Sequence, residues 1–435
     1  MLSSYRKSFI EGDILKDKNF SLKKQKIGRA MYIAEAALEY LISILVASSY
    51  LATLTKSLGM SDSLTGILSS IISLGGLFQL LSISIRKTRV KRLVMALSII
   101  NQLLFMLLYV IPVTAINSKI KIVLFVVSIL CAYILYNLAH PKKINWLMSL
   151  VEDSHRGSFT ANKEIISLIS GIVFSFCMGA VIDHFKDKGE IRTAFILSAA
   201  VIFVLMILHT LSMLFTVEPE QPQTERKTLL AAVRSLAGNK DIIHITIIFV
   251  LYYIATYISI PFYGTYLIGE LGLSLKFVSV LTIVSSISRI LVSKLWGKYA
   301  DKKSFAAMTE KCLIVLSLAY ACAFAATPLS GKYMFILYYI IHGIALGGIN
   351  SALINLIFDY VSPDKRADSL AICQAASGVA GFLATLAVSP LVSHIQTNGN
   401  TVFGIPMYAQ QFLSLISLVL TVITIIYVKK VILKP

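Results

Sequence analysis

Five ionisable residues lie well inside long apolar stretches, where a charge needs a partner or a polar cavity. They are Glu35, Glu39, Lys142, Lys143 and Arg289. Glu35 and Glu39 are four residues apart, so they share one face of a helix. Two close carboxylates repel each other, so one of them can have a raised pKa and titrate, and lysines can pair with them or bind an anion. The pattern therefore predicts either a coupling or binding role or a structural ion pair.

Aromatic and amide side chains gather in three of the apolar stretches. The residues predicted to contact a solute are Tyr136, Asn137, His140, Asn145, Trp146, Tyr253, Tyr257, Tyr339, His342, Asn350 and Asn355. Aromatic faces together with hydroxyl and amide groups suit a sugar, glycoside or nucleoside, and equally an aromatic amphiphile. Tyrosines at the ends of membrane spans also form interfacial belts, which is the alternative interpretation. His209, isolated in another stretch, is interpreted as a hydrogen-bonded structural histidine.

The composition is that of a membrane protein. The 435 residues are 57% hydrophobic and 14% charged, with a mean hydropathy of +0.78. A membrane-spanning helix needs about 20 apolar residues. The long continuous runs exclude a soluble enzyme and a β-barrel, which would alternate in shorter segments. Twelve spans are expected at 30–54, 62–84, 93–114, 120–149, 162–183, 193–216, 242–268, 274–296, 305–327, 332–358, 367–393 and 403–428.

The distribution of charge sets the expected topology. Most Lys and Arg residues fall in loops on one side of the predicted spans, and such loops are cytoplasmic. The net charge of +18 is thus explained without a nucleic-acid partner. We expect a multi-pass protein of a prokaryotic cytoplasmic (inner) membrane, with both termini in the cytoplasm. The expected parts are a tail at 1–29, a six-helix bundle at 30–216, a cytoplasmic linker at 217–240, a second bundle at 241–428 and a tail at 429–435.

The two halves of the sequence repeat. Displaced by 210 residues, Val151–Ser158 lies over Val361–Asp368, and Gly189 lies over Gly399. Displaced by 213 residues, Gly59 lies over Gly272. Two six-helix halves related by an axis along the membrane normal form a transporter architecture.

Loop motifs add a family resemblance. Gly297-Lys-Tyr-Ala-Asp301 resembles the loop signature of the major facilitator superfamily, and Arg156-Gly157 and Asp359…Arg366 resemble its motif at the ends of spans four and ten. The equivalent N-terminal loop departs from the signature, because Ser84 and Thr88 replace its Gly and Asp. The fifth span also lacks the Gly/Pro-rich pattern of drug-efflux members.

The resemblance implies an all-α fold of two pseudo-symmetric six-helix bundles, with spans one, four, seven and ten lining a central cavity. Glu35 lies about 9 Å into the membrane, and Lys142 and Lys143 lie about 10–12 Å from the same side. We therefore expect the carboxylates of span one to face the lysines of span four. Gly297, Asp301, Arg156, Asp359 and Arg366 are expected to act in gating.

We expect a secondary transporter that works by alternating access and functions as a monomer. Proton-coupled uptake of a sugar- or glycoside-like nutrient is the favoured function, although sodium could replace the proton. The alternatives are proton-coupled efflux of amphiphiles and an organic-anion carrier that uses Lys142 and Lys143. No nucleotide-binding loop or catalytic grouping is present, so no enzyme activity, cofactor or metal is expected.

Overall fold

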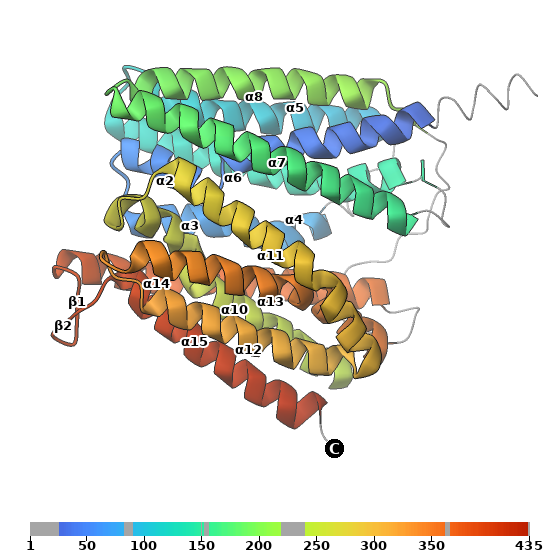
Figure 1. The fold of residues 1–435 in the computed structure, drawn as a ribbon. Helices are drawn as coiled ribbons and strands as arrows, with labels where there is room; N and C mark the ends of the chain where they lie inside the picture. The colour runs from blue at the N-terminus through green and yellow to red at the C-terminus, as the bar shows by residue number, and fades with distance from the viewer. Residues whose placement is uncertain are drawn as a thin grey trace, which may run out of the picture.

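The structure is a computed structural model that describes residues 26–81, 90–148, 150–151, 156–218, 240–361 and 366–433. Long helices run side by side through the molecule (Figure 1). Many large apolar side chains on their outer faces are exposed, including Val173, Leu291 and Leu295. Such a surface suits contact with lipid rather than water. The expected all-α membrane fold is confirmed.

The first two expected spans are interrupted helices. The first helix, Lys26–Leu45, is followed after a 42° bend by α2, Ser48–Ser57. The second span consists of three consecutive pieces: α3 (Asp62–Ser70), the 3-10 turn η1 (Ile71–Leu74) and α4 (Gly75–Leu81). The side chain of Ser61 accepts a hydrogen bond from the Leu64 amide and so caps the start of α3.

The other helices are longer. Those of the N-terminal half are α5 (Val90–Val110), which ends in η3 (Ile111–Val113), α6 (Ser118–Met148), α7 (Arg156–Asp187) and α8 (Ile191–Leu214). Those of the C-terminal half are α10 (Lys240–Thr265) with the π-helical turn η5 (Tyr266–Glu270), α11 (Leu275–Lys302), α12 (Phe305–Phe324), α13 (Gly331–Tyr360), α14 (Arg366–Thr397) and α15 (Ala409–Tyr427) with η6 (Val428–Ile432).

Ten helices within the described residues are long and apolar enough to cross a membrane, and the bent first pair would make eleven. Three predicted boundaries are each wrong by six residues. α7 begins at Arg156 rather than at 162. α11 continues to Lys302, so Gly297 and Asp301 lie in its last turns rather than in a loop. The last span begins at Ala409 rather than at 403, because a two-residue hairpin of β1 (Thr401–Val402) and β2 (Ile405–Pro406) precedes it.

The internal repeat is visible in the helix boundaries. α7 and α14 each have 32 residues, and both of their ends are displaced by the 210 residues expected from the sequence. The paired glycines share one backbone conformation: φ is 69° at Gly59 and 61° at Gly272, and 74° at Gly189 and 70° at Gly399. Positive φ favours glycine, so each half uses the same two glycine turns.

The two halves meet through a limited set of helices. Figure 1 shows α5 to α8 along one side and α12 to α15 along the other, with α3, α4 and α11 between them. α7 packs against α11, and α14 packs against α3 and α4. At the end of this interface, the carboxylate of Asp183 accepts hydrogen bonds from the amides of Leu275 (3.1 Å) and Lys276 (2.7 Å) in the first turn of α11. The Gln396 side chain donates to Asp62 (2.8 Å).

Candidate functional site: a buried ion-pair network

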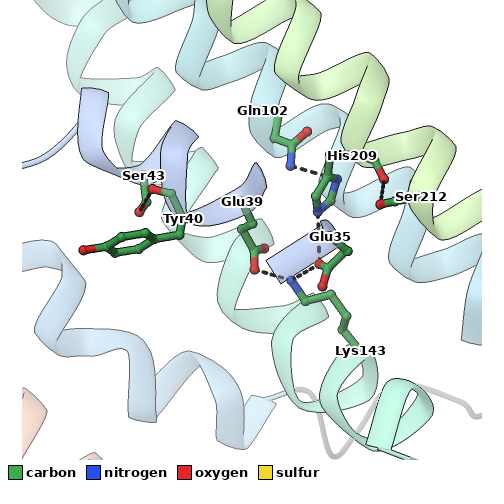
Figure 2. Close-up of polar contacts among 8 residues, drawn as sticks. All are labelled: Glu35, Glu39, Tyr40, Ser43, Gln102, Lys143, His209 and Ser212. Carbon is green, nitrogen blue, oxygen red and sulfur yellow. Dashed lines mark hydrogen bonds and ion pairs between the residues drawn. The ribbon is translucent and has the colours of Figure 1, made fainter. Parts of the chain in front are cut away.

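Lys143 of α6 lies between the two carboxylates of the first helix (Figure 2). Its Nζ is 2.8 Å from Glu35 Oε1 and also contacts Glu39 Oε2. The side chains of Lys143 and Glu35 are 3% and 2% exposed, whereas that of Glu39 is 19% exposed. The expected contact between spans one and four is therefore present, and Lys143 makes it.

Two residues from neighbouring helices extend the network. His209 of α8 is fully buried, and its Nε2 lies 3.0 Å from Glu35 Oε1. The other ring nitrogen, Nδ1, lies 3.1 Å from Nε2 of Gln102 on α5. A neutral histidine fits these contacts, with Nε2–H donating to Glu35 and Nδ1 accepting from the amide. The network thus joins four helices of the N-terminal half.

The network has an unequal number of charges. With His209 neutral, Glu35 and Glu39 carry two negative charges against the single positive charge of Lys143. Glu39 is the most exposed of these side chains, at 19%.

Aromatic side chains surround the lysine. Nζ of Lys143 lies 5.9 Å from the centre of the Tyr136 ring, within the range of a cation–π contact. The Tyr136 ring in turn lies 5.3 Å from the ring of His140. Tyr32 of the first helix is buried nearby, and Nζ of Lys163 lies 5.2 Å from the centre of its ring.

A metal ion is a poor fit to this cluster as it stands. Ligand atoms of Glu35, Glu39 and His209 lie within 4.8 Å of one another, a spacing that metals accept. The ammonium group of Lys143 already contacts both carboxylates. The lysine therefore supplies the cation in this place.

The other predicted solute contacts on α6 lie in packed surroundings. Asn137 is buried, donates to the Tyr133 carbonyl (2.9 Å) and accepts from Gln79 (3.2 Å). The indole of Trp146 is buried and donates to the carbonyl of Val217 (3.0 Å). The helix continues through Pro141. The side chain of Asn145 lies outside the described part of the structure.

The predicted contacts on α10 and α13 all lie in the C-terminal half, and their ring contacts form two separate groups. The rings of Tyr253 and Tyr257 stack 5.7 Å apart, and the ring of His342 stacks on Tyr338 at 5.1 Å. The half-buried ring of Tyr339 lies 5.4 Å from Tyr338. Asn350 is exposed, and Asn355 donates to the Ser351 carbonyl (2.8 Å). Within the described residues, none of these groups contacts the network around Lys143.

The remaining predicted residues lie toward helix ends or on α11. Arg289 is half-buried on α11, and Asp301 and Asp359 are exposed. Asp301 makes no ion pair within the described residues. Arg156 and Arg366 begin α7 and α14, but their side chains lie outside the described part.

The sequence does not place His209 or Gln102 in the network. The two hydrogen bonds of His209 fit its interpretation as a structural histidine, whereas nothing in the sequence singles out Gln102. Their helices carry apolar residues on all sides, so the sequence gives no direction for either side chain. The one available signal was the presence of polar residues at similar depths in α5 and α8.

Two related halves of membrane-spanning helices are an architecture found in many secondary transporters. The family model described as Major Facilitator Superfamily matches residues 36–385 and 245–431. The chain therefore belongs to the major facilitator superfamily. It is a membrane transporter of a small-molecule substrate rather than an enzyme.

Solved structures share this fold at low identity. The nucleoside transporter NupG, as a point mutant, is 14% identical with a TM-score of 0.72, covering 92% of this chain and 98% of that chain. A bacterial homologue of the human lysosomal transporter Spinster is 14% identical with a TM-score of 0.66, covering 94% and 96%. A POT family transporter in complex with 5-aminolevulinic acid is 12% identical with a TM-score of 0.65, covering 94% and 96%. The curated proteins gave no match.

Proposed function

We propose that this transporter couples uptake of a neutral, polar, sugar-, glycoside- or nucleoside-like solute to proton entry, by alternating access across a prokaryotic cytoplasmic membrane. Both termini lie in the cytoplasm in this proposal, and the monomer is the working unit. No cofactor is needed beyond the ion gradient. The observation that carries the proposal is the position of Lys143 between a buried Glu35 and a partly exposed Glu39.

The network supplies a physical route for coupling. A proton that reaches Glu39 from the solvent removes one negative charge, so Lys143 is left to pair with Glu35. The first helix is then held to α6 by one ion pair instead of two. α2, which continues this helix after the bend, packs against α10 of the other half. A weaker interaction between the first helix and α6 can thus shift the equilibrium between the inward-facing and outward-facing states.

Two alternatives have less support. An anion carrier would use Lys142 and Lys143 to bind its substrate, but Lys143 already contacts two carboxylates. Efflux of amphiphilic cations would need a carboxylate that can bind the cation, and Lys143 competes with the cation for the carboxylates of Glu35 and Glu39. The nucleoside transporter with the similar fold transports a solute with a ring and hydroxyl groups, which accords with the proposed substrate class.

The test uses purified protein in proteoliposomes with an imposed proton gradient. In Glu39→Gln, gradient-driven accumulation of solute should be lost, while exchange of labelled solute without a gradient should continue. Glu310→Gln is the matched control, because Glu310 is a buried carboxylate that is ion-paired with Lys429 (3.2 Å) in the other half. Accumulation retained in Glu39→Gln would remove Glu39 from the coupling role.

A further inference from the structure

The bend in the first span has an unusual backbone. Ser48, the first residue of α2, has φ of 48°, which is uncommon for a residue with a side chain. Its carbonyl oxygen lies against α10 at Gly264, where an added Cβ would be 2.9 Å from that oxygen. Glycine at 264 therefore permits the close approach of the two backbones. Strained, interrupted helices at membrane depth are tolerated where they line a cavity.

Such a cavity lies beside the bend, with a volume of about 220 Å³. The first helix, α2 and α7 of the N-terminal half line it together with α11 of the C-terminal half. The hydroxyl-bearing residues most relevant to binding are Tyr40, Ser43, Ser49, Ser279, Thr282 and Ser286. The other lining residues are mainly apolar, and none of the described lining residues is charged.

Most of these hydroxyl groups can offer only their oxygens, as hydrogen-bond acceptors, because their protons already bond to backbone carbonyls. Ser279 donates to the Leu275 carbonyl (2.9 Å), and Thr282 donates to the Val278 carbonyl (3.1 Å). Ser43 donates to the Tyr40 carbonyl (2.7 Å) in the same way. Ser279 Oγ already accepts from Ser175 Oγ (3.0 Å), so one of its lone pairs is taken. Among the described residues, the oxygens of Thr282 and Ser43 can still accept from hydrogen-bond donors in the cavity.

Ser49 is the exception. Its side chain is 2% exposed, and its Oγ has no hydrogen-bond partner among the described residues. A buried hydroxyl without a partner destabilises the fold, and a ligand in the cavity that bonded to it would relieve this.

We propose that this cavity is a subsite for the ring of an uncharged, hydroxyl-bearing solute. This inference rests on the proposed function and names the chemistry of its substrate. Hydroxyl groups on the solute would donate to the serine and threonine oxygens, and the ring would lie against the apolar wall. The lack of charge among the lining residues disfavours an anion or a cation. The volume is below the roughly 300–1,000 Å³ of sites for drug-sized ligands, so it fits a small solute or a single ring.

Tyr40 connects this subsite to the ion-pair network. It follows Glu39 directly in the first helix, but its side chain points away from the network (Figure 2). The Tyr40 ring lies close to α7 at Gly171, where an added Cβ would be 2.3 Å from Tyr40 Cε1. A solute in the cavity would therefore touch the helix that carries both carboxylates and also α11 of the other half.

The experiment is thermal unfolding of the full chain in detergent with three neutral probes: uridine, adenosine and methyl β-D-glucopyranoside. At least one should raise the unfolding temperature, since a ligand that binds only the folded state stabilises it. Ser49→Ala should not lower the unfolding temperature without solute, yet should weaken probe binding by about five- to tenfold. Ser43→Leu, which fills the cavity, should abolish the shift. Ser198→Ala is the control, because Ser198 is buried in α8 and bonded to the Ala194 carbonyl (2.8 Å).

Three results would overturn the proposal: no shift with any neutral probe, a shift only with uridine monophosphate or tetraphenylphosphonium, or a shift unchanged in Ser49→Ala and Ser43→Leu. Binding is measured without a gradient, so it does not depend on proton coupling. A shift retained in Glu39→Gln, reduced in Ser49→Ala and lost in Ser43→Leu would support the subsite even if coupling through Glu39 failed.

Discussion

Lys143 Nζ lies 2.8 Å from Glu35 Oε1, and neither side chain is more than 3% exposed. Removal of one partner of a buried pair leaves an uncompensated charge and costs about 3–5 kcal/mol. We therefore expect Lys143→Met to lower the thermal unfolding temperature strongly. Addition of Glu35→Gln to this variant should restore part of the loss, because it removes the unpaired charge.

The matched control for this pair is Lys429→Met. Lys429 is largely exposed and pairs with Glu310 at 3.2 Å, and Lys311, 3.8 Å from the same carboxylate, remains when Lys429 is removed. Its loss should therefore cost less than the loss of Lys143. Additive effects of Glu35→Gln and Lys143→Met, with no recovery in the double variant, would contradict the pairing.

His209 should stabilise the fold through its two ring nitrogens. His209→Leu leaves Glu35 without its imidazole donor and Gln102 without its acceptor, so we expect a loss of about 1–3 kcal/mol. His209→Gln keeps a donor and an acceptor and should lose less. Unfolding temperatures in detergent compare the two, and equal losses would show that packing rather than hydrogen bonding makes His209 important.

The carboxylate of Asp183 should hold one end of the interface between the halves. It accepts from two amides in the first turn of α11, where a negative charge also meets the helix dipole. Asp183→Asn should favour opening at this end by about two- to fivefold. The measurement is the rate at which a membrane-impermeant maleimide labels Ser279→Cys in a background without native cysteines.

Asp187→Asn provides the control for that labelling, since Asp187 is exposed at the end of the same helix. Its labelling rate should equal that of the parent. Equal rates in Asp183→Asn and the parent would rule out a holding role for Asp183.

The glycine turns of the repeat should resist substitution. Gly189→Ala places a side chain at φ of 74°, which costs about 1–2 kcal/mol. Gly297→Ala lies in a helix with nothing within 4 Å of the added Cβ, so it should stabilise the fold by up to about 1 kcal/mol. Opposite changes in unfolding temperature are expected, and a similar change in both would contradict the turn assignment.

The sequence predicted the fold and the contact between the first and fourth spans, but not the whole network. Membrane depth follows from counting residues along a helix, which is why Glu35, Glu39 and Lys143 were expected together. Helix rotation does not follow from depth when all faces are apolar, so the contacts of His209 and Gln102 with the network did not follow from the sequence. The bend at Ser48 was also missed, because no proline or glycine marks it in the sequence.

The most direct test of coupling is proton movement driven by solute. Wild-type proteoliposomes with a solute gradient and no imposed pH difference should acidify their interior as solute enters, and a trapped pH-sensitive dye reports this. Glu39→Gln should carry solute without acidification. Solute entry with no pH change in the wild type, or equal acidification in Glu39→Gln, would contradict proton coupling through the Glu39–Lys143–Glu35 network.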